Sequence, residues 1–185
     1  MIVNIRGTHG SGKSTLVQQL LKKYKCAPVY EDGGKRPAAH VVTIPGLRKP
    51  LFLIGPYLTA CGGCDAIQPY SLIWPRVEEY AKKGHVIFEG ALISSCVGAI
   101  GESMAQRKKD CIVLFLDTPL DVCLGRIKAR RSLRGNQSPL NPKNTASKYL
   151  STERGRAKLE SMGVRCETLN YKKSFKQLLE VILEN

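Results

Sequence analysis

The sequence of 185 residues has no apolar run that approaches the length of about 20 residues needed to cross a membrane. It also leaves little room for a signal peptide, because a glycine-rich motif already begins at Gly7. No internal repeat and no disordered tail is visible. We therefore expect one domain over residues 1–185, large enough to bury its own core, in a cytoplasmic protein without a membrane partner.

The cysteines do not form the pattern of a disulfide framework. Their number is odd, seven, and they are scattered through apparent strands and helices. Cys61-Gly62-Gly63-Cys64 has the spacing of half a zinc or redox site, but no second pair and no closely spaced histidine pair accompanies it. We expect mostly buried, reduced thiols and a tight loop at this motif, with a zinc or redox site as the minor alternative.

Acidic residues are scarce. The sequence has 15 of them against 29 lysines and arginines, which gives a net charge of +14. From Arg126 to Lys158 there are ten cations and the single anion Glu153. Ten cations exceed what one bound triphosphate needs, although solubility could account for some of them. A polyanionic partner, above all nucleic acid, is therefore expected.

The clearest motif is a phosphate-binding loop near the start of the chain. The pattern G-x-x-x-x-G-K-S follows the apolar run Met1 to Ile5, a predicted strand, and opens the amphipathic stretch Thr15 to Tyr24, a predicted helix. Glycines let successive N–H groups point at phosphate oxygens, and the helix adds the positive end of its dipole. The motif predicts that the protein binds a nucleoside triphosphate. The candidate nucleotide-binding residues are Gly7, Thr8, His9, Gly10, Ser11, Gly12, Lys13, Ser14 and Thr15.

Two features follow before residue 55. Ala27 to Tyr30 is predicted as a second strand, and Glu31 and Asp32 come directly after it, where α/β sheets place ligands. A solvated turn is an equally good explanation of these two acids. Apolar runs on both sides of a Pro-Gly turn predict a β-hairpin at about residues 40–54, inserted into the α/β alternation. The hairpin could shape a substrate pocket.

Candidate substrate contacts lie in the irregular stretch from Gly55 to Gln68 and the helix expected after it. Tyr57 and Asp65 flank the cysteine motif, and Trp74 is the only tryptophan. Aromatic side chains near glycines and an acid could stack on and orient a flat base. For Trp74, packing in the core is the more common role of a lone tryptophan on an amphipathic helix.

The second half of the chain adds a candidate metal ligand and a basic helix. His85 to Phe88 is predicted as a buried strand that ends at Glu89, the place of a magnesium-binding carboxylate in P-loop enzymes. The helix predicted from Leu120 to Arg131 places Arg126 and Arg130 on one face. They would clamp phosphates if this face is turned to the P-loop, and are solvated otherwise. Residues 132–148, rich in Ser, Asn, Pro and Gly, predict a lid.

Taken together, the P-loop, the strand ending at Glu89, and the segment Leu116 to Ile127 with Arg130-Arg131 resemble P-loop kinases of the nucleoside and nucleoside monophosphate kinase group. The resemblance covers essentially the whole chain. It implies an α/β three-layer sandwich with a five-stranded parallel sheet in the order 2-3-1-4-5. It also implies roles by position: Lys13 for phosphates, Ser14 and Glu89 for Mg²⁺, Glu31 or Asp32 as base toward the acceptor, and lid or phosphate contacts for Arg126, Arg130 and Arg131.

One departure bears on the acceptor. Gly90 stands where nucleoside and thymidylate kinases have an arginine after the acid, which argues against a small-nucleotide substrate. Gly55-Pro56-Tyr57, the motif from Cys61 to Asp65 and the basic surplus look like phage 5-hydroxymethyluracil DNA kinases, which phosphorylate a hydroxymethyl group on bases already in DNA. Such an enzyme would act in the host cytoplasm, and would need a flipped or otherwise accessible base.

The expected reaction is in-line transfer of the γ-phosphate of ATP to a hydroxyl, with cations around the transferring group. Glu31, Asp32 or Asp65 would orient or deprotonate the hydroxyl, and closure of the lid would exclude water. Three hypotheses remain from the sequence: a kinase acting on DNA bases, a kinase for a nucleoside, nucleotide or other small molecule, and a non-enzymatic nucleotide-dependent DNA-binding module.

Overall fold

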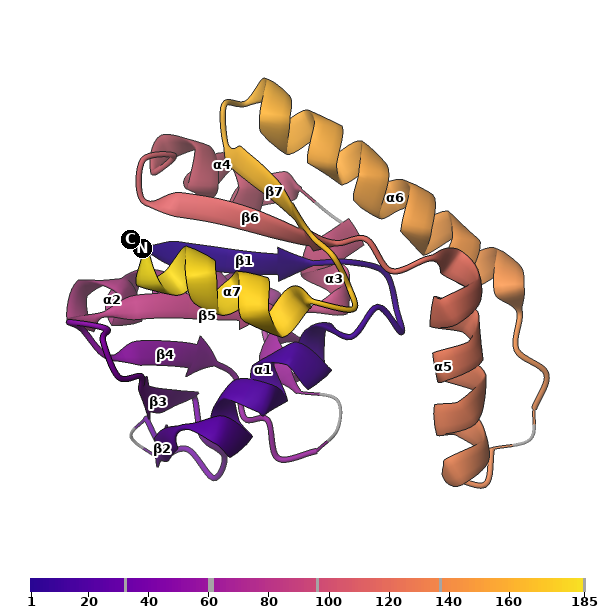
Figure 1. Cartoon of the computed structure of the whole chain (residues 1–185), viewed down its shortest axis with the longest axis horizontal. Helices are drawn as coiled ribbons and strands as arrows, with labels where there is room; N and C mark the ends of the chain where they lie inside the picture. Colours follow the sequence, from indigo (N-terminus) through magenta and orange to yellow (C-terminus); the bar gives the residue numbers. More distant parts are fainter. Residues whose placement is uncertain (32, 60–61, 96, 137, 185) are drawn as a thin grey trace.

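The computed structural model describes residues 1–31, 33–59, 62–95, 97–136 and 138–184 as a mixed α/β fold (Figure 1). The strands within these ranges are β1 (Ile2–Arg6), β2 (Lys25–Val29), β3 (Ala39–Thr43), β4 (Leu51–Ile54), β5 (His85–Glu89), β6 (Cys111–Leu116) and β7 (Arg165–Leu169). The α-helices are α1 (Lys13–Lys23), α2 (Ile73–Lys83), α3 (Ala91–Ser95), α4 (Gly98–Gln106), α5 (Leu120–Leu133), α6 (Pro142–Ser161) and α7 (Ser174–Leu183). Two short 3₁₀ helices, η1 (Gly63–Ala66) and η2 (Tyr70–Leu72), precede α2.

The sheet has seven strands in the order β2-β3-β4-β5-β1-β6-β7, so the expectation of five strands is wrong. Five of the seven, β4-β5-β1-β6-β7, are parallel to one another and follow the order 2-3-1-4-5. The second parallel strand, however, is β4 and not the segment from Ala27 to Tyr30. That segment is part of β2, which pairs antiparallel with β3.

The difference has a physical reason in the two sequences. β2 contains Pro28, which has no N–H to donate and is confined to sheet edges, and most of its residues are exposed. β4 is Leu-Phe-Leu-Ile and is buried throughout, as strands covered on both faces are. β3 and β4 do form the predicted hairpin, but β4 belongs to the parallel sheet and is not an insertion.

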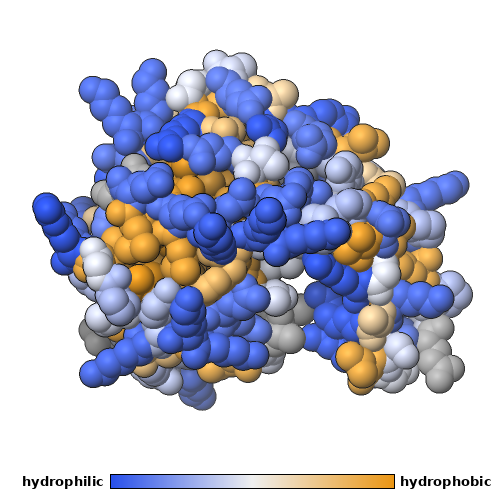
Figure 2. Space-filling view, in the orientation of Figure 1, coloured by the Kyte–Doolittle hydropathy of each residue, from blue (hydrophilic) through white to orange (hydrophobic). Residues whose placement is uncertain are grey.

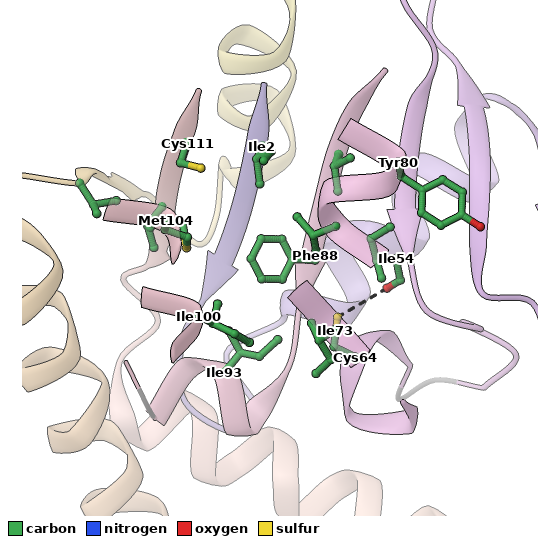
Figure 3. Packing of buried hydrophobic residues seen from close by; sticks show 14 of the residues in the cluster. Ile2, Ile54, Cys64, Ile73, Tyr80, Phe88, Ile93, Ile100, Met104 and Cys111 are labelled. Carbon is green, nitrogen blue, oxygen red and sulfur yellow. Dashed lines mark hydrogen bonds between the residues drawn. The ribbon is translucent and has the colours of Figure 1, made fainter. Parts of the chain in front are cut away.

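Helices cover both faces of the sheet. Along β1, Ile2 packs into one apolar cluster and Val3 into the other, because successive strand residues point to opposite faces. The first cluster surrounds Phe88 and includes side chains of α2, α3, α4 and α6 (Figure 3). The second is closed by α1 and α7, which lie over the near face of the sheet in Figure 1. This arrangement has the three layers expected from the sequence.

α5 projects beyond the carboxyl edge of the sheet, and α6 returns along the molecule toward the start of β7 (Figure 1). α5 continues to Leu133 and α6 begins at Pro142, so the two ends of the predicted lid at 132–148 belong to helices. α6 begins at Pro142 because Asn141 caps it. The Asn141 Oδ1 accepts the Lys143 N–H at 3.0 Å, and a proline at the first helical position is favourable.

Figure 2 shows hydrophilic side chains over much of the viewed face, and a gap between the projecting α5 region and the rest of the molecule. Among the helices of the described ranges, none combines the length and the apolar character that a membrane span requires.

Candidate active site

The P-loop connects β1 to α1 at the carboxyl edge of the sheet. β1 is fully buried and pairs with β5 and β6 on its two sides, so the position of the loop is fixed at the centre of the sheet. Gly10 and Gly12 have φ angles of 79° and 107°, in the region that favours glycine. The helix begins at Lys13, as the motif predicts, so the loop meets the positive end of α1.

The segment from β6 to α5 holds the P-loop from the other side. A Cβ at Gly10 would lie 2.5 Å from the Cys123 carbonyl oxygen, so α5 packs directly on the loop backbone. The Thr118 hydroxyl donates to the Ser11 carbonyl at 2.8 Å, and Arg126 Nη1 donates to the same carbonyl at 3.0 Å. Thr118 is buried, so its hydrogen bond to the P-loop is shielded from water.

Lys13 is folded onto the loop that precedes it. Its Nζ donates to the carbonyl oxygens of Gly7 at 2.6 Å and Thr8 at 3.1 Å. Burial lowers the pKa of this ammonium group, and the nearby Glu89 carboxylate opposes the shift. The charged Nζ therefore already lies within the loop that would surround a phosphate.

Glu89 ends β5, and its carboxylate meets the first turn of α1. The Ser14 hydroxyl donates to Glu89 Oε1 at 3.0 Å, so the two predicted metal ligands are brought together. Glu89 is only 1% exposed, and this burial raises its pKa to about 7, while Lys13 and the Ser14 hydrogen bond act in the opposite direction. An acid with such a pKa can be protonated or charged near neutral pH.

The motif from Gly62 to Asp65 packs tightly around Glu89 and Tyr57. A Cβ at Gly62 would lie 2.7 Å from the Tyr57 Cα, and one at Gly63 would overlap the Glu89 side chain. Tyr57 itself is buried, with a φ of 42° that is unusual for a residue with a side chain. Its hydroxyl lies close enough to Glu89 to lower the pKa of that carboxyl, yet no hydrogen bond of normal geometry satisfies it within the described residues.

Asp65 caps the short helix α3. Its two carboxylate oxygens accept the Ala91 N–H at 2.8 and 2.9 Å, an interaction favoured at a helix N-terminus. A Cβ at Gly90 would lie 3.0 Å from Asp65 Oδ1. Asp65 therefore occupies the space beside position 90, where related kinases carry an arginine.

These groups surround one cleft of about 730 Å³ at the carboxyl edge of the sheet. The P-loop and α1 contribute His9 to Leu16 and Gln19 to its lining. The rest of the lining consists of Gly62, Asp65, Ala66, Glu89, Ala91, Arg126, Arg130, Tyr171 and Ser174. Seven of the nine predicted P-loop contacts, His9 to Thr15, thus line the cleft, whereas Gly7 and Thr8 contribute the carbonyls that hold Lys13.

Sequence reasoning missed Tyr171, which follows the last strand, and Ser174 and Gln19. The Arg126 guanidinium lies over the Tyr171 ring, 5.6 Å from its centroid, and the Tyr171 N–H is held by Asp117 Oδ1 at 2.6 Å. The signal was available, because Tyr171 comes just after a parallel strand, and ligands bind outside the carboxyl ends of such strands.

The predicted arginines separate into two groups. Arg126 and Arg130 both line the cleft, so of the two alternatives left by the sequence their shared face of α5 is turned to the P-loop. Arg131 does not line the cleft. Its Nη2 donates to Asn136 Oδ1 at 3.3 Å at the far end of α5.

Glu31 and Trp74 also lie away from the cleft, and the buried Tyr57, a predicted substrate contact, is not among its lining residues. Glu31 follows the edge strand β2 and is bound by Arg76 of α2, whose Nε donates to Glu31 Oε1 at 2.9 Å. Trp74 packs edge-on against Phe88, with ring centroids 6.3 Å apart, as part of the core under α2. Asp32 lies outside the described residues.

The cysteine motif has no metal-binding geometry in the part of the chain that the structure describes, where no cluster of three His, Cys, Asp or Glu side chains occurs. Cys64 is buried, with its Sγ 4.0 Å from the Ile54 carbonyl oxygen, and burial raises the pKa of its thiol well above the usual range. Cys61 lies outside the described residues. The described half of the motif is thus a tight loop with a buried thiol.

Comparison with known proteins gives consistent results. A family model described as 5-hmdU DNA kinase matches residues 1–149. The 5-hmdU DNA kinase of Pseudomonas phage PaMx11 is 38% identical over 185 residues, which cover 97% of each chain. The 5-hmdU DNA kinase of Pseudomonas phage M6 is 27% identical over 188 residues, 97% of this chain and 96% of that one.

A third relative, the 5-hmdU DNA kinase of Delftia phage PhiW-14, is 25% identical over 166 residues, 80% of this chain and 59% of its own length. The family match spans the P-loop, Glu89 and the arginines of α5, so it includes most of the cleft. On the extent of these matches, the chain belongs to the 5-hmdU DNA kinase family.

Proposed function

We propose that this protein is an ATP-dependent kinase that transfers the γ-phosphate to the hydroxymethyl group of 5-hydroxymethyluracil in DNA, as a step of phage DNA modification. The observation that carries the proposal is the single cleft in which the P-loop, Glu89, Asp65 and two arginines meet, in a chain of this family. Phosphoryl transfer requires positioning and charge stabilisation above all, and this cleft offers groups suited to both.

The triphosphate would lie on the P-loop amides, with Lys13 released from the Gly7 and Thr8 carbonyls to contact phosphate oxygens. Arg126 and Arg130 would stabilise the charge on the transferring group from the α5 side. The nucleoside end would extend toward Tyr171, beside Arg126.

Ser14 and Glu89 fit a magnesium ion, because a hydroxyl and a carboxylate 3.0 Å apart supply the hard oxygen ligands that this ion prefers. When bound, the ion would neutralise charge on the β- and γ-phosphates. Glu89 must be ionised to hold a cation, and the nearby ammonium of Lys13 favours that form.

For the acceptor hydroxyl, Asp65 is the strongest of the three predicted carboxylates. It lines the cleft, whereas Glu31 is held by Arg76 outside the cleft. Each carboxylate oxygen has a second lone pair, so Asp65 can accept a hydrogen bond from the acceptor while it caps α3. Orientation of the hydroxyl is its main contribution, because the transition state of phosphoryl transfer is loose.

Two observations favour DNA over a free nucleotide as the acceptor. Position 90 is a glycine whose added Cβ would crowd Asp65 Oδ1 at 3.0 Å, and residues 126–158 carry ten cations against one anion. A basic surface of this density attracts the phosphate backbone. A base in a duplex would have to leave the stack to reach the cleft.

The test is transfer of labelled γ-phosphate from ATP to DNA that contains 5-hydroxymethyluracil, and separately to a panel of free nucleosides and nucleotides. Label in the DNA that is lost in Lys13→Ala supports the proposal. Label only in a free nucleoside or nucleotide would instead establish a small-molecule kinase. Asp65→Asn should lower transfer strongly, whereas Glu31→Gln should not.

A further inference from the structure

A second hollow, of about 410 Å³, lies next to the cleft, between the P-loop, α5 and the first turns of α6. His9 and Arg130 line both the cleft and this hollow, so the two meet at these side chains. Asn144, Ser147 and Lys148 of α6 line the opposite wall. The reaction outlined above uses only the cleft, which leaves this hollow without a role.

The side chains around the hollow suit an anion. Its ionisable lining residues are all basic, namely His9, Arg130 and Lys148, and no carboxylate lines it within the described chain. The N-terminus of α6, a helix of 20 residues, adds the positive end of its dipole and the amide and hydroxyl groups of Asn144 and Ser147. Phosphate is the anion that such a combination binds well.

Lys148 is the best placed of these cations. It is partly buried, and its Nζ contacts the Ser95 hydroxyl of α3 at 3.4 Å. Among the described residues no carboxylate lies within ion-pair distance of Lys148, so its charge is not neutralised. Its field reaches His9, whose pKa is lowered first by burial and then by the charges of Lys13, Lys148 and Arg130.

The position of the hollow relates it to the acceptor side of the cleft. Ser95 ends α3, and the start of the same helix is capped by Asp65, the group assigned to the acceptor hydroxyl. A base whose hydroxymethyl group reaches Asp65 leaves its sugar and flanking phosphates outside the cleft. The hollow lies at that side, bridged to α3 by Lys148.

We propose that the hollow binds a backbone phosphate of the DNA strand that carries the target base, with Lys148 as its main contact. The proposal rests on the proposed function, since it names how that site would hold DNA. Phosphate contacts of this kind fix position and carry no sequence information. The hollow would thus favour a base within a strand over the same base in a free nucleoside, which has no flanking phosphodiester.

The test compares Lys148→Gln with Lys128→Gln, which removes the same charge from an exposed position of α5 that lines neither hollow nor cleft. For an oligonucleotide with 5-hydroxymethyluracil, Lys148→Gln should raise KM about 10-fold and lower the slope of log affinity against log salt by about one. Lys128→Gln should change KM less than about 2-fold, and Lys148→Arg should preserve binding. ATP affinity and turnover of free 5-hydroxymethyldeoxyuridine should be unchanged in all three.

Ser147→Glu is a second test of the hollow, because it places a carboxylate at an exposed position of the same wall. It should weaken DNA binding as much as Lys148→Gln does. Equal effects of Lys148→Gln and Lys128→Gln would overturn the proposal in favour of general attraction. Loss of ATP affinity with DNA binding intact would overturn it as well, by showing that the hollow holds a phosphate of ATP.

Failure of the proposed function would look different. If the wild-type protein transfers no phosphate to the DNA, the proposed function is refuted. Binding of the oligonucleotide can still be followed by fluorescence anisotropy. Wild type and Lys148→Gln with the same affinity and the same salt slope would then overturn the phosphate site by itself.

Discussion

The buried carboxyl of Glu89 predicts that the ligand-free protein loses stability as the pH rises. Its pKa is 4.5 in an unstructured chain and about 7 in the folded protein, so the folded state holds a proton that the unfolded state has already lost. The stability from this group is fully present below about pH 4.5 and is lost as the pH rises through about 7. The full difference corresponds to about 3 kcal/mol.

The variant Glu89→Gln removes this titration and nearly preserves shape. Relative to wild type, its free energy of unfolding should improve by about 2 kcal/mol between about pH 5.5 and about pH 8, because the wild type pays for a buried charge over this range. Phosphoryl transfer should be lost in the same variant. Urea unfolding at several pH values, without nucleotide and with a metal chelator present, measures the difference.

Glu79→Gln is the matched control. Glu79 is an exposed carboxylate whose pKa is lowered by the Lys83 hydrogen bond, so its pH dependence should be small and of opposite sign. Titrating groups that do not interact with Glu89 are common to the variants and the wild type and cancel in the comparison. If the stability difference between Glu89→Gln and wild type is the same at both pH values, Glu89 is not buried as described, and the reasoning is refuted.

Three further predictions address the surroundings of the cleft. Gly63→Ala should destabilise the protein by at least about 2 kcal/mol, because φ at this position is 73° and the added Cβ would overlap the Glu89 side chain. Urea unfolding measures this, and an unchanged midpoint would contradict the tight packing of Gly63 on Glu89. Arg126→Ala should lower kcat/KM for ATP about 10-fold, since it removes a guanidinium that lines the cleft beside Tyr171. Steady-state kinetics at saturating acceptor measures this, and an unaltered kcat/KM would place the triphosphate elsewhere. Glu31→Gln should leave the rate of phosphoryl transfer within about 2-fold of wild type and lower the free energy of unfolding by less than about 1 kcal/mol, because its ion pair with Arg76 is partly exposed. A drop in the transfer rate of about 100-fold would restore Glu31 as the base.

The core of the site could be predicted from the sequence because local rules determine it. The glycine and lysine spacing of the P-loop specifies a backbone shape, and the carboxyl edge of a parallel sheet brings Glu89 to Ser14 even though 75 residues separate them. The spacing of Arg126 and Arg130 predicts that they share one face of α5, but only the packing of α5 on the P-loop turns that face toward the cleft.

Other features depend on partners that no local pattern announces. Glu31 is held by Arg76, 45 residues later in the chain, and Asp65 caps a helix that begins 26 residues after it. By contrast, the assignment of the second parallel strand could have been right. Pro28 disfavours a central strand, and the uniformly apolar β4 favours one.

The hydrogen bonds from Thr118 and Arg126 to the P-loop carbonyls have a consequence for the thermodynamics of nucleotide binding. Together with the close packing of α5 on Gly10, these contacts within the protein fix the backbone between Gly10 and Ser11. The conformational entropy of this segment is therefore lost when the chain folds and not when ATP arrives. Association then requires little ordering of the loop, which leaves more of the interaction free energy to appear as affinity.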